Sequence, residues 1–461
     1  MKLPTGIFLV SSLVGAAVAT PLAPVPYNIS LVESNKLRRV LHRKALYEHA
    51  KEFQSFADST SVRNRVAGSI GHNLTVDYIY DTLVATGYYN VEKQPFTYVF
   101  SEGNTSFSAL STKYASEYMT YSPSTGGSTL TAQLVKVANV GCDQSDYPEL
   151  TGKIALISRG ICQFGPYVPV ASISGANGTA LVAAIEAGPV QGSLLVNSTT
   201  EVRHTNNVLA TTKGGDQNNI VMSGGHTDSV AAGPGINDNG SGSIGNLEIA
   251  LQLTKWLVKN AVRFGFWSAE EFGLIGSRYY VENLPEAERA KVALYLNLDM
   301  IASPNFGYFV YDGDGSTFNI TGPPGSGAIE HLLQDYFKEV GLPTLPSNSD
   351  GRSDYAPFME AGIPIGAIFT GAEEVKTAEQ AALWGGQVGV AFDSQYHKAG
   401  DDINNLNQGA WIQNTKAAAH VIATYARSTE TIPKRSLPKR AKRDNKHAIS
   451  GAYGSEPVHI A

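Results

Sequence analysis

The stretch Ile220-Val221-Met222-Ser223-Gly224-Gly225-His226-Thr227-Asp228-Ser229 decides the fold of this 461-residue chain. Its first three residues form an apolar run typical of a buried strand, and a histidine and an aspartate follow after two glycines. Further on, Gly-Ile-Asn-Asp-Asn-Gly-Ser-Gly at 235–242 leads into apolar residues at helical spacing over 244–257. A strand, a polar turn and a helix in this order indicate one unit of an α/β sheet.

The same alternation continues through the rest of this region. We expect further strands at 263–267, 292–298 and 365–369, and helices at 329–340 and 414–426. The pattern predicts an α/β fold, with a mixed, mainly parallel sheet and helices on both of its faces. The length suggests two domains plus tails. Hydrophobic residues make up 43% and charged residues 16%, which excludes a wholly disordered chain.

Changes in composition predict how the chain is divided. Residues 108–205 contain short β-rich runs such as 154–157, with many Gly and Ser, and interrupt the α/β pattern like an inserted domain. The predicted division is 1–19 for a signal peptide, 20–45 for a pro-segment or a loose first helix, 46–107 for the first segment of the α/β domain, 108–205 for a β-rich insertion, 206–430 for the main part of the α/β domain, and 431–461 for a basic, disordered or processed tail.

The two ends of the chain carry signals for export and processing. Lys2, the apolar run Ile7–Val18 and the small residues Ala17-Val18-Ala19 form a signal peptide with its cleavage site. The apolar run falls short of the roughly 20 residues of a membrane span, so we expect secretion rather than a membrane anchor, with a vacuolar or lysosome-like compartment as the alternative. In the tail, three Lys-Arg pairs at 434, 439 and 442 are candidate processing sites, or solvated charge that persists.

Glycosylation sequons and cysteines agree with a secretory route. A seventh sequon, at Asn239, lies among the polar motifs described below and is expected to be unmodified. An oxidising compartment favours a disulfide between Cys142 and Cys162, the only cysteines, with two separate buried thiols as the alternative. The six candidate glycosylation sites are Asn28, Asn73, Asn104, Asn177, Asn197 and Asn319.

The charge distribution argues against nucleic acid as a partner. The whole chain has a formal charge of −6, and the basic tail hides a more acidic body of about −11 over residues 1–431. An acidic body repels a polyanion rather than attracting it.

Five short polar motifs lie where an α/β sheet would present its strand ends. Taken singly, each has an ordinary explanation, since a histidine after a strand is usually a satisfied histidine and paired glutamates usually mean a solvated face. The motifs are Gly224–Ser229, Gly235–Gly242, Ser268-Ala269-Glu270-Glu271-Phe272-Gly273, Asn297-Leu298-Asp299-Met300 and Gln395-Tyr396-His397.

Together the motifs predict a metal centre. Asp299 directly follows Leu-Asn-Leu on a strand expected to be buried, where a carboxylate needs a strong partner. Glu270 and Glu271 stand between an aromatic strand and Phe-Gly, an unusual place for a solvated charge pair. Imidazole nitrogen and carboxylate oxygen are ligands that Zn²⁺ prefers, and a bridging carboxylate lets two ions lie about 3.5–4 Å apart.

The order His, Asp, Glu-Glu, Asp, Tyr-His resembles the co-catalytic two-zinc aminopeptidase family, in the form that carries a protease-associated (PA) insertion. The resemblance spans nearly the whole mature chain. It includes Asn64–Gly68 and Val76–Ile79 at the entry to the catalytic domain, Gly141-Cys142 and Gly152–Phe164 in the PA domain, and Gly351–Phe358 and Gly362–Pro364 on the substrate side.

The resemblance implies a role for each residue. Asp238 would bridge two Zn²⁺ ions, and the Asp238-Asn239 peptide is expected to be cis, as in relatives. Glu270 would be the general base, Tyr396 would stabilise the oxyanion, and Asp228 would hold the second ring nitrogen of His226. Arg352 and Phe369 would line the pocket for the first side chain, with plain core packing as the alternative for Phe369. The implied zinc ligands are His226 and Asp299 for one ion, Glu271 and His397 for the other, and Asp238 for both.

The sequence departs from the family pattern at the Tyr-His motif, where cysteines are common and this chain has Gln395 and Gly400. The reaction implied is removal of the N-terminal residue from peptides. A carboxypeptidase or a glutaminyl cyclase of the same fold is the runner-up, and a carboxypeptidase needs a basic pocket, for which Arg352 is the candidate. A catalytically dead receptor would have lost ligands, and all are present here.

Overall fold

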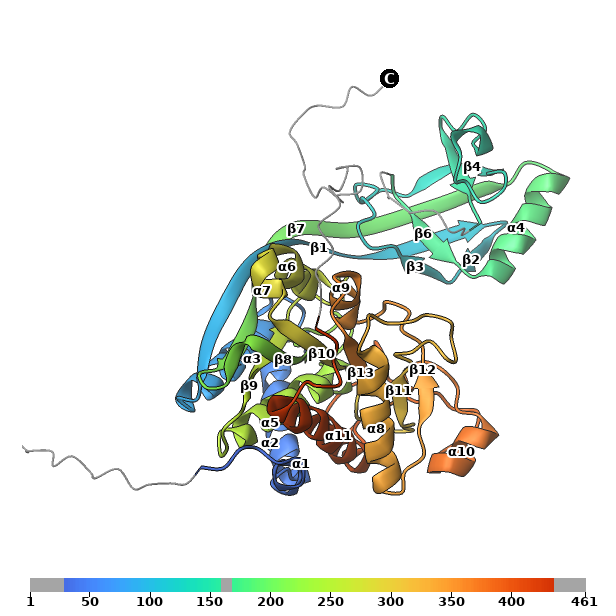
Figure 1. The fold of residues 1–461 in the computed structure, drawn as a ribbon. Helices are drawn as coiled ribbons and strands as arrows, with labels where there is room; N and C mark the ends of the chain where they lie inside the picture. The colour runs from blue at the N-terminus through green and yellow to red at the C-terminus, as the bar shows by residue number, and fades with distance from the viewer. Residues whose placement is uncertain (1–28, 159–167, 435–461) are drawn as a thin grey trace, which may run out of the picture.

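The structure is a computed structural model that describes residues 29–158 and 168–434. Figure 1 shows a larger lobe, in which helices cover a sheet, and a smaller lobe joined to it by two long strands, β1 (Tyr89–Ala109) and β7 (Gln191–Thr212). The predicted signal peptide, Asn28, Cys162 and the tail beyond Lys434 lie outside the described residues. The predicted disulfide and the processing of the tail therefore remain predictions.

The large sheet has a parallel centre and antiparallel flanks, which confirms the predicted fold class. Its strands follow the order β12-β11-β13-β10-β8-β9-β7-β1-β2. The parallel centre consists of β13 (Ile365–Phe369), β10 (Val292–Leu298), β8 (Asp216–His226) and β9 (Asn260–Trp267). The outer strands are β11 (Phe309–Tyr311) and β12 (Leu345–Ser347) at one edge, and β7, β1 and β2 (Thr112–Tyr114) at the other.

Helices cover both faces of the sheet because its central strands are apolar on both sides. On β10, Leu294 and Leu296 face the core under the helices that include α5 (Gly242–Leu253) and α11 (Gln408–Arg427), whereas Tyr295 points the other way. The Tyr295 ring stacks on Phe358 of α9 (Tyr355–Glu360), with ring centroids 3.8 Å apart. The helices are α1 (Ser34–Arg39), α2 (Arg43–Asp58), α3 (Ile70–Ala85), α4 (Gly175–Ala187), α5 (Gly242–Leu253), α6 (Ile275–Asn283), α7 (Glu286–Arg289), α8 (Ser326–Glu339), α9 (Tyr355–Glu360), α10 (Ala378–Trp384) and α11 (Gln408–Arg427).

Residues 29–45 pack into the main core rather than forming a loose helix, and the pro-segment remains a prediction. Val32, Leu37 and Leu41 are at most 1% exposed, and α1 packs against α11. The predicted boundary at residue 46 falls inside α2. The burial of this segment could not be predicted from the sequence, because three apolar residues at irregular spacing among basic ones form no periodic pattern.

The helix predicted over 244–257 ends earlier, at Leu253. Leu257 instead pairs with the N-terminal segment. Its N–H donates to Ser30 O at 3.0 Å, and its carbonyl oxygen accepts the Val32 N–H at 2.8 Å. A tertiary contact with a distant segment therefore stops a helix that the apolar spacing would have continued.

The inserted lobe begins in the middle of two strands rather than at loops. β1 and β7 pair without interruption from Tyr89 opposite Thr212 to Ala109 opposite Gly192. The first half of β1, including Tyr98 and Phe100, packs on the main lobe, and Phe107 lies in the core of the inserted lobe. The predicted boundaries at 108 and 205 therefore cut through paired strands, and the transition on β1 lies between Phe100 and Phe107.

The remainder of the inserted lobe is small and β-rich, as predicted. Leu134, Leu181 and Val196 form its core together with Phe107. Its own elements are β3 (Ser116–Tyr118), β4 (Leu130–Lys136), β5 (Lys153–Leu156), β6 (Ala171–Ile173) and α4.

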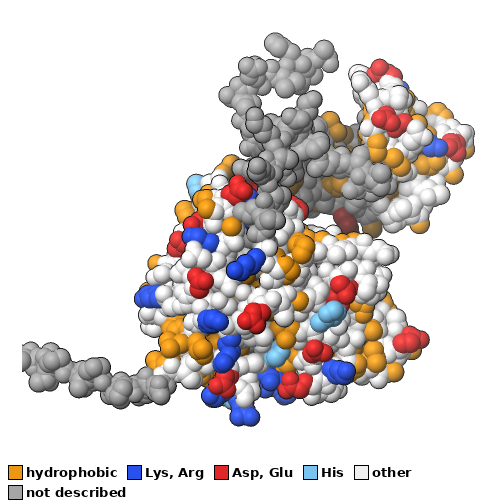
Figure 2. Space-filling model, in the orientation of Figure 1, with side chains coloured by type: hydrophobic (Ala, Val, Ile, Leu, Met, Phe, Trp, Pro, Cys, Tyr) orange, Lys and Arg blue, Asp and Glu red, His pale blue; other side chains and the backbone are white. Residues whose placement is uncertain are grey.

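The surface carries mixed charges. On the face shown in Figure 2, Lys and Arg side chains are interspersed with Asp and Glu. Among the predicted sequons, Asn73, Asn104, Asn197 and Asn319 are exposed and Asn177 is half-buried. Asn239 is fully buried. Within the described ranges, no helix is long and apolar enough to cross a membrane.

Candidate active site

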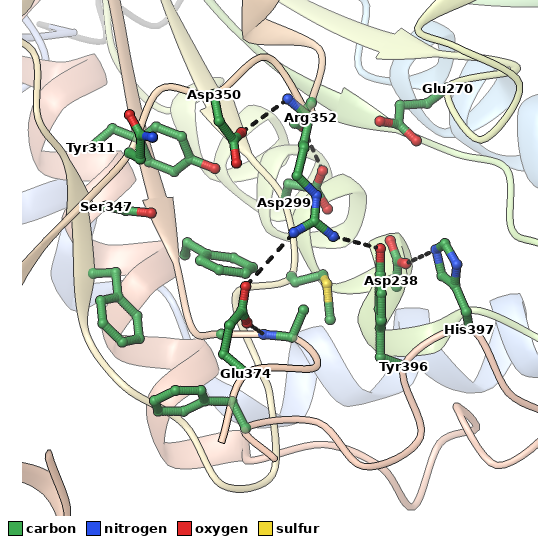
Figure 3. A pocket seen from close by; sticks show the side chains of 18 of the residues that line it. Asp238, Glu270, Asp299, Tyr311, Ser347, Asp350, Arg352, Glu374, Tyr396 and His397 are labelled. Carbon is green, nitrogen blue, oxygen red and sulfur yellow. Dashed lines mark hydrogen bonds and ion pairs between the residues drawn. The ribbon is translucent and has the colours of Figure 1, made fainter. Parts of the chain in front are cut away.

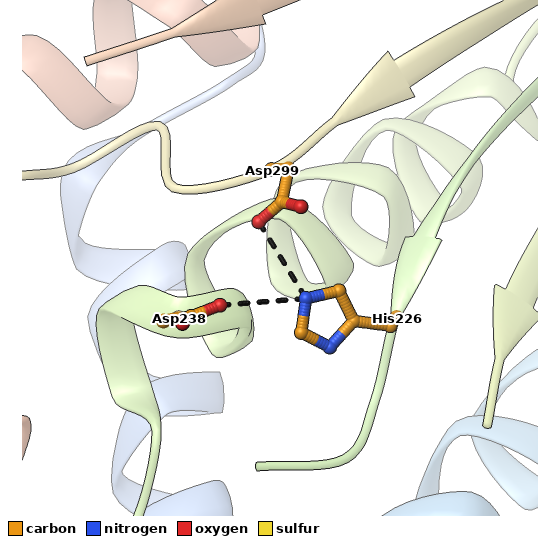
Figure 4. A group of neighbouring side chains, drawn as sticks. All are labelled: His226, Asp238 and Asp299. Carbon is orange, nitrogen blue, oxygen red and sulfur yellow. Dashed lines mark ion pairs between the residues drawn. The ribbon is translucent and has the colours of Figure 1, made fainter. Parts of the chain in front are cut away.

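The ends of three adjacent parallel strands bring the polar motifs together. His226 is the last residue of β8, Asp299 directly follows β10, and the turn at 268–274 follows β9. Because β9, β8 and β10 are neighbours and parallel, their carboxyl ends meet at one edge. His226 Nε2 lies 3.5 Å from Asp299 Oδ1 and 3.4 Å from Asp238 Oδ1, an arrangement shown in Figure 4.

Asp238 connects two groups of side chains. It lies in the helical turn Ile236–Ser241, and the Asp238-Asn239 peptide is cis. One carboxylate oxygen faces His226, and the other lies 3.1 Å from His397 Nε2. His397 Nε2 is also 3.2 Å from Glu271 Oε2. The structure thus forms two triads that share Asp238: with His226 and Asp299, and with Glu271 and His397.

The spacing and the unpaired atoms of these triads fit zinc. Two ligands about 2.0–2.1 Å from a tetrahedral ion lie about 3.3 Å apart, close to the distances of 3.1–3.5 Å found here. Glu271 Oε1 and Asp299 Oδ1 are buried and have no hydrogen-bond partner. Buried carboxylate oxygens without a donor need a cation or a proton, so the donor set and its geometry fit a zinc centre.

The charges of the site depend on one another. Burial raises the pKa of Glu270 well above its usual value and that of Glu271 to about 7. Burial alone would lower the pKa of His226, but the carboxylates of Glu270 and Asp299 outweigh it and raise that pKa well above its usual value. The carboxylates therefore favour positive charge at His226, and a bound dication would take the place of its proton.

Glu270 belongs to neither of the two triads that share Asp238, but it lies beside them, near His226 and Glu271. Its Oε2 is 3.8 Å from His226 Nε2, longer than the ligand spacings, and its side chain is buried. A carboxylate in this place is within reach of a water or substrate atom held at the triads.

Asp228 lies on the side of His226 that the resemblance implied, but its carboxylate is farther from the ring than a hydrogen bond allows. Its Oδ1 is 3.7 Å from His226 Nδ1, too far for a hydrogen bond, and the nearer partner of that nitrogen is the Asp228 carbonyl oxygen at 3.2 Å. The carboxylate instead accepts the backbone N–H groups of Glu270 and Glu271, at 3.2 and 3.4 Å. Through these two bonds Asp228, which lies just past the end of β8, fixes the turn that carries both glutamates.

A buried polar network, missed in the sequence, fixes the loop that carries His397. Asp401 accepts the backbone N–H groups of Asn237 and Asp238, at 2.8 and 2.9 Å. Asn405 donates to both Asp401 and Asp393. Burial, with the charge of Asp393, raises the pKa of Asp401 to about 8. The network ties the His397 loop directly to the turn of Asp238.

Gln395 and Gly400, which replace the cysteines common in the family, lie against each other. A Cβ added at Gly400 would meet the Gln395 side chain, with its Cδ at 2.7 Å. The glutamine therefore fills the space beside Gly400.

Tyr396 and Arg352 form one wall of the cavity in Figure 3. The Tyr396 ring stacks on His397, with centroids 3.9 Å apart. The Arg352 guanidinium donates to Tyr396 Oη at 3.4 Å and to Glu373 at 3.0 Å. Both predicted residues thus line the site, at its solvent side.

The cavity beside the triads has a volume of about 370 Å³, and apolar side chains line part of it. Phe369 lies there as expected. The aromatic residues that accompany it were missed, because Phe309, Phe318 and Phe392 come from separate loops or short strands and share no motif. The apolar lining consists of Met300, Phe309, Tyr311, Phe318, Phe369 and Phe392.

A parallel-centred α/β sheet whose strand ends gather two histidines and four carboxylates defines the class of zinc-dependent exopeptidases. The profile of peptidase family M28 matches residues 207–422, and that of the PA domain matches residues 130–229. The probable leucine aminopeptidase 2 of Aspergillus fumigatus is 47% identical over 89% of each chain. Leucine aminopeptidase 2 of Trichophyton rubrum is 44% identical over 90% of each. The chain belongs to peptidase family M28, in its form with a PA domain.

Solved structures agree on the fold. The aminopeptidase from Aneurinibacillus sp. strain AM-1 superposes with a TM-score of 0.70 at 25% identity, covering 88% of this chain and 100% of that one. A zinc aminopeptidase from Bacillus subtilis has a TM-score of 0.60 at 23% identity, covering 85% and 99%.

Proposed function

We propose that the protein is a secreted aminopeptidase that uses two zinc ions to hydrolyse the N-terminal peptide bond of peptides with a free amino terminus. The observation that carries this proposal is the position of Asp238, whose two oxygens face two different histidines, each with a carboxylate of its own. The family and the zinc aminopeptidases of the same fold support zinc as the metal.

Each residue has a place in the proposed reaction. When bound, zinc would supply a Lewis acid that polarises the scissile carbonyl and makes water more acidic. Glu270 would take a proton from the attacking water and return it to the leaving amine, for which a raised pKa is suited. Tyr396 would donate its hydroxyl hydrogen to the carbonyl oxygen as that oxygen becomes negative.

The cavity favours a large apolar first residue. Four phenylalanines that line the cavity would contact the first side chain, and burying apolar surface there contributes about 25 cal/mol per Å². Carboxylates at the triads would attract the free amine. The relatives named leucine aminopeptidases support this substrate class.

A carboxypeptidase of the same fold fits less well. Arg352 is the one arginine or lysine among the described residues that line the cavity. Its guanidinium is already paired with Glu373 at 3.0 Å and lies 3.7 Å from Glu374, so it is neutralised before a terminal carboxylate could arrive.

A panel of aminoacyl amides, each with a free and an acetylated amine, tests the proposal together with zinc analysis. We expect hydrolysis of the free-amine leucyl and phenylalanyl substrates only, at two zinc ions per chain. Cleavage of substrates with a blocked amine, or activity at one zinc or none, would overturn it. Recovery of the protein from culture medium with its N-terminus near Thr20 tests the proposed export.

A further inference from the structure

The turn that carries Glu270 and Glu271 has a shape that its own residues disfavour. Ala269 and Leu274, at its two ends, have left-handed backbone angles of φ 60° and 59°, and Gly273 has φ 106°. For side chains with a Cβ this region is sterically unfavourable. The turn must therefore be held in place by the groups around it.

One anchor comes from the main lobe. The Asp228 carboxylate accepts the N–H groups of Glu270 and Glu271, and the Glu270 carbonyl accepts those of Gly273 and Leu274, both at 2.8 Å. These bonds fix the two glutamates from beneath. They leave the tip of the turn, at Phe272, to other contacts.

The second anchor is aromatic and comes from the strand that leads into the inserted lobe. The Phe272 ring lies 5.2 Å from that of Tyr98 and 5.4 Å from that of Phe100, between centroids. Tyr98 is itself fixed, since its hydroxyl donates to Ala67 O at 2.8 Å. The Phe100 ring is covered by Arg203 of β7, whose guanidinium carbon lies 3.3 Å from the ring centroid.

The third anchor comes from the inserted lobe itself. The Tyr121 hydroxyl donates to Phe272 O at 3.3 Å. Tyr121 follows β3, and its backbone N–H donates to Ser101 Oγ, which also bonds to the Tyr118 hydroxyl. The segment 118–121 is thus fastened to the β1–β7 ribbon at the place where it reaches the catalytic turn.

We infer that the PA insertion positions the catalytic carboxylates: Tyr121, together with Phe272, holds the turn in the shape that points Glu270 and Glu271 into the site. Tyr121 and Phe272 are positioning residues, since neither of them lines the cavity. The inference rests on the proposed roles of Glu270 and Glu271. Small displacements of a catalytic group cost rate rather than substrate binding, so the coupling acts on kcat.

Tyr121→Phe tests the contact from the inserted lobe in the full-length, zinc-loaded enzyme. Loss of one weak hydrogen bond is expected to lower kcat on leucyl amide about threefold, with KM and zinc content unchanged. The matched control is Tyr147→Phe: Tyr147 is 39% exposed against 38% for Tyr121, and its hydroxyl donates to a backbone carbonyl, Gly141 O, inside the same lobe. The control should match the wild type.

Phe272 tests the turn itself. Phe272→Ala should lower kcat about tenfold or more, and Phe272→Tyr, which keeps the ring, should restore it. Hydrogen exchange supplies a readout independent of activity: the amides of Gly273 and Leu274 should exchange faster in Tyr121→Phe and Phe272→Ala than in the wild type, with or without zinc. Unchanged exchange and unchanged kcat in both variants would overturn the inference.

The inference and the proposed function fail in different ways. If Glu270→Gln keeps full activity, the proposed base is wrong, whatever Tyr121 does. If Glu270→Gln is inactive but the Tyr121 and Phe272 variants behave like the wild type, the base stands and the positioning role falls.

Discussion

Glu270 and Glu271 are adjacent residues with different surroundings. Side chains that follow each other along a strand point to opposite faces, so both can face the site only because the chain turns after Trp267, where β9 ends. Glu271 Oε2 approaches His397, whereas Glu270 stands 3.8 Å from His226. Proximity in the sequence therefore does not imply a shared role.

Glutamine variants separate the two proposed roles. Glu270→Gln keeps the shape but removes the base, so zinc content should stay at two while kcat falls about 10²- to 10⁴-fold. Glu271→Gln weakens a ligand, so one zinc should become labile and added zinc should partly restore activity. Zinc stoichiometry and kcat are measured side by side. Metal loss in Glu270→Gln with both ions kept in Glu271→Gln would reverse the assignment.

His72 makes stability fall at acid pH. It is fully buried, its Nδ1 accepts the Gly68 N–H at 3.2 Å, and its Nε2 lies 2.9 Å from Thr227 Oγ1 and 3.0 Å from Ser268 Oγ. A proton on Nδ1 would remove that acceptor. Burial, with the charges of Arg65 and His226, lowers the pKa of His72 to about 3.

The lowered pKa of His72 determines how the free energy of unfolding changes with pH. Between pH 6.5 and 3 the unfolded chain binds a proton that the folded chain excludes, so the free energy of unfolding should fall on acidification, by up to about 1.4 kcal/mol per pH unit. Urea titrations of the metal-free protein at pH 7, 6 and 5 measure this, with His72→Gln as the comparison. The variant should show a shallower dependence, and parallel slopes would contradict the assignment.

Among the elements, regular strands were predictable and the connections that fix the site were not. The strands expected at 292–298 and 365–369 match β10 and β13, because continuous apolar runs between polar turns are typical of strands buried on both faces. Asp393, Asp401 and Asn405 were missed, since buried polar residues in a loop have no periodicity. The triads were found because a resemblance supplied the pairing of motifs far apart in the chain.

The loop of His397 gives an element-scale prediction. The Asp401 carboxylate accepts two backbone N–H groups, those of Asn237 and Asp238. An asparagine has one carbonyl oxygen and can accept only one of them, and its NH₂ group would face the other. Asp401→Asn should therefore weaken zinc binding about 10- to 100-fold, measured by competition with a chelator above the Asp401 pKa of about 8, where that carboxylate is ionised. Asp402→Asn, at the adjacent position, whose carboxylate bonds within its own loop to Asn404 N, should bind zinc like the wild type. Equal affinities in both variants would contradict the role of the network.

On the scale of the whole molecule, the ribbon decides where the inserted lobe can be removed. Gly103 and Ser198 are partners across β1 and β7, so a two-residue Asn-Gly turn can replace residues 104–197 and close a hairpin. This variant should keep the main lobe folded with its full zinc content, at a reduced kcat because Tyr121 is lost. Removal of 108–205 should instead destabilise it strongly, since residues 96–107 of β1 would lose their partners on β7. Zinc analysis and thermal unfolding distinguish the two, and loss of zinc in the shorter deletion would place the lobe within the catalytic core.

The contact between α1 and α11 has a consequence for biosynthesis. Ser34 Oγ lies 2.6 Å from His420 Nδ1, and Arg427 donates to Val32 O at 3.1 Å, so the first described helix packs on the last. A chain emerging from the ribosome presents α1 long before its main partner α11, which begins at Gln408. The nascent chain thus carries exposed apolar surface, and lacks the segment of His397, for most of its translation. Because His397 belongs to the second triad, the site can be complete only after most of the chain has been made.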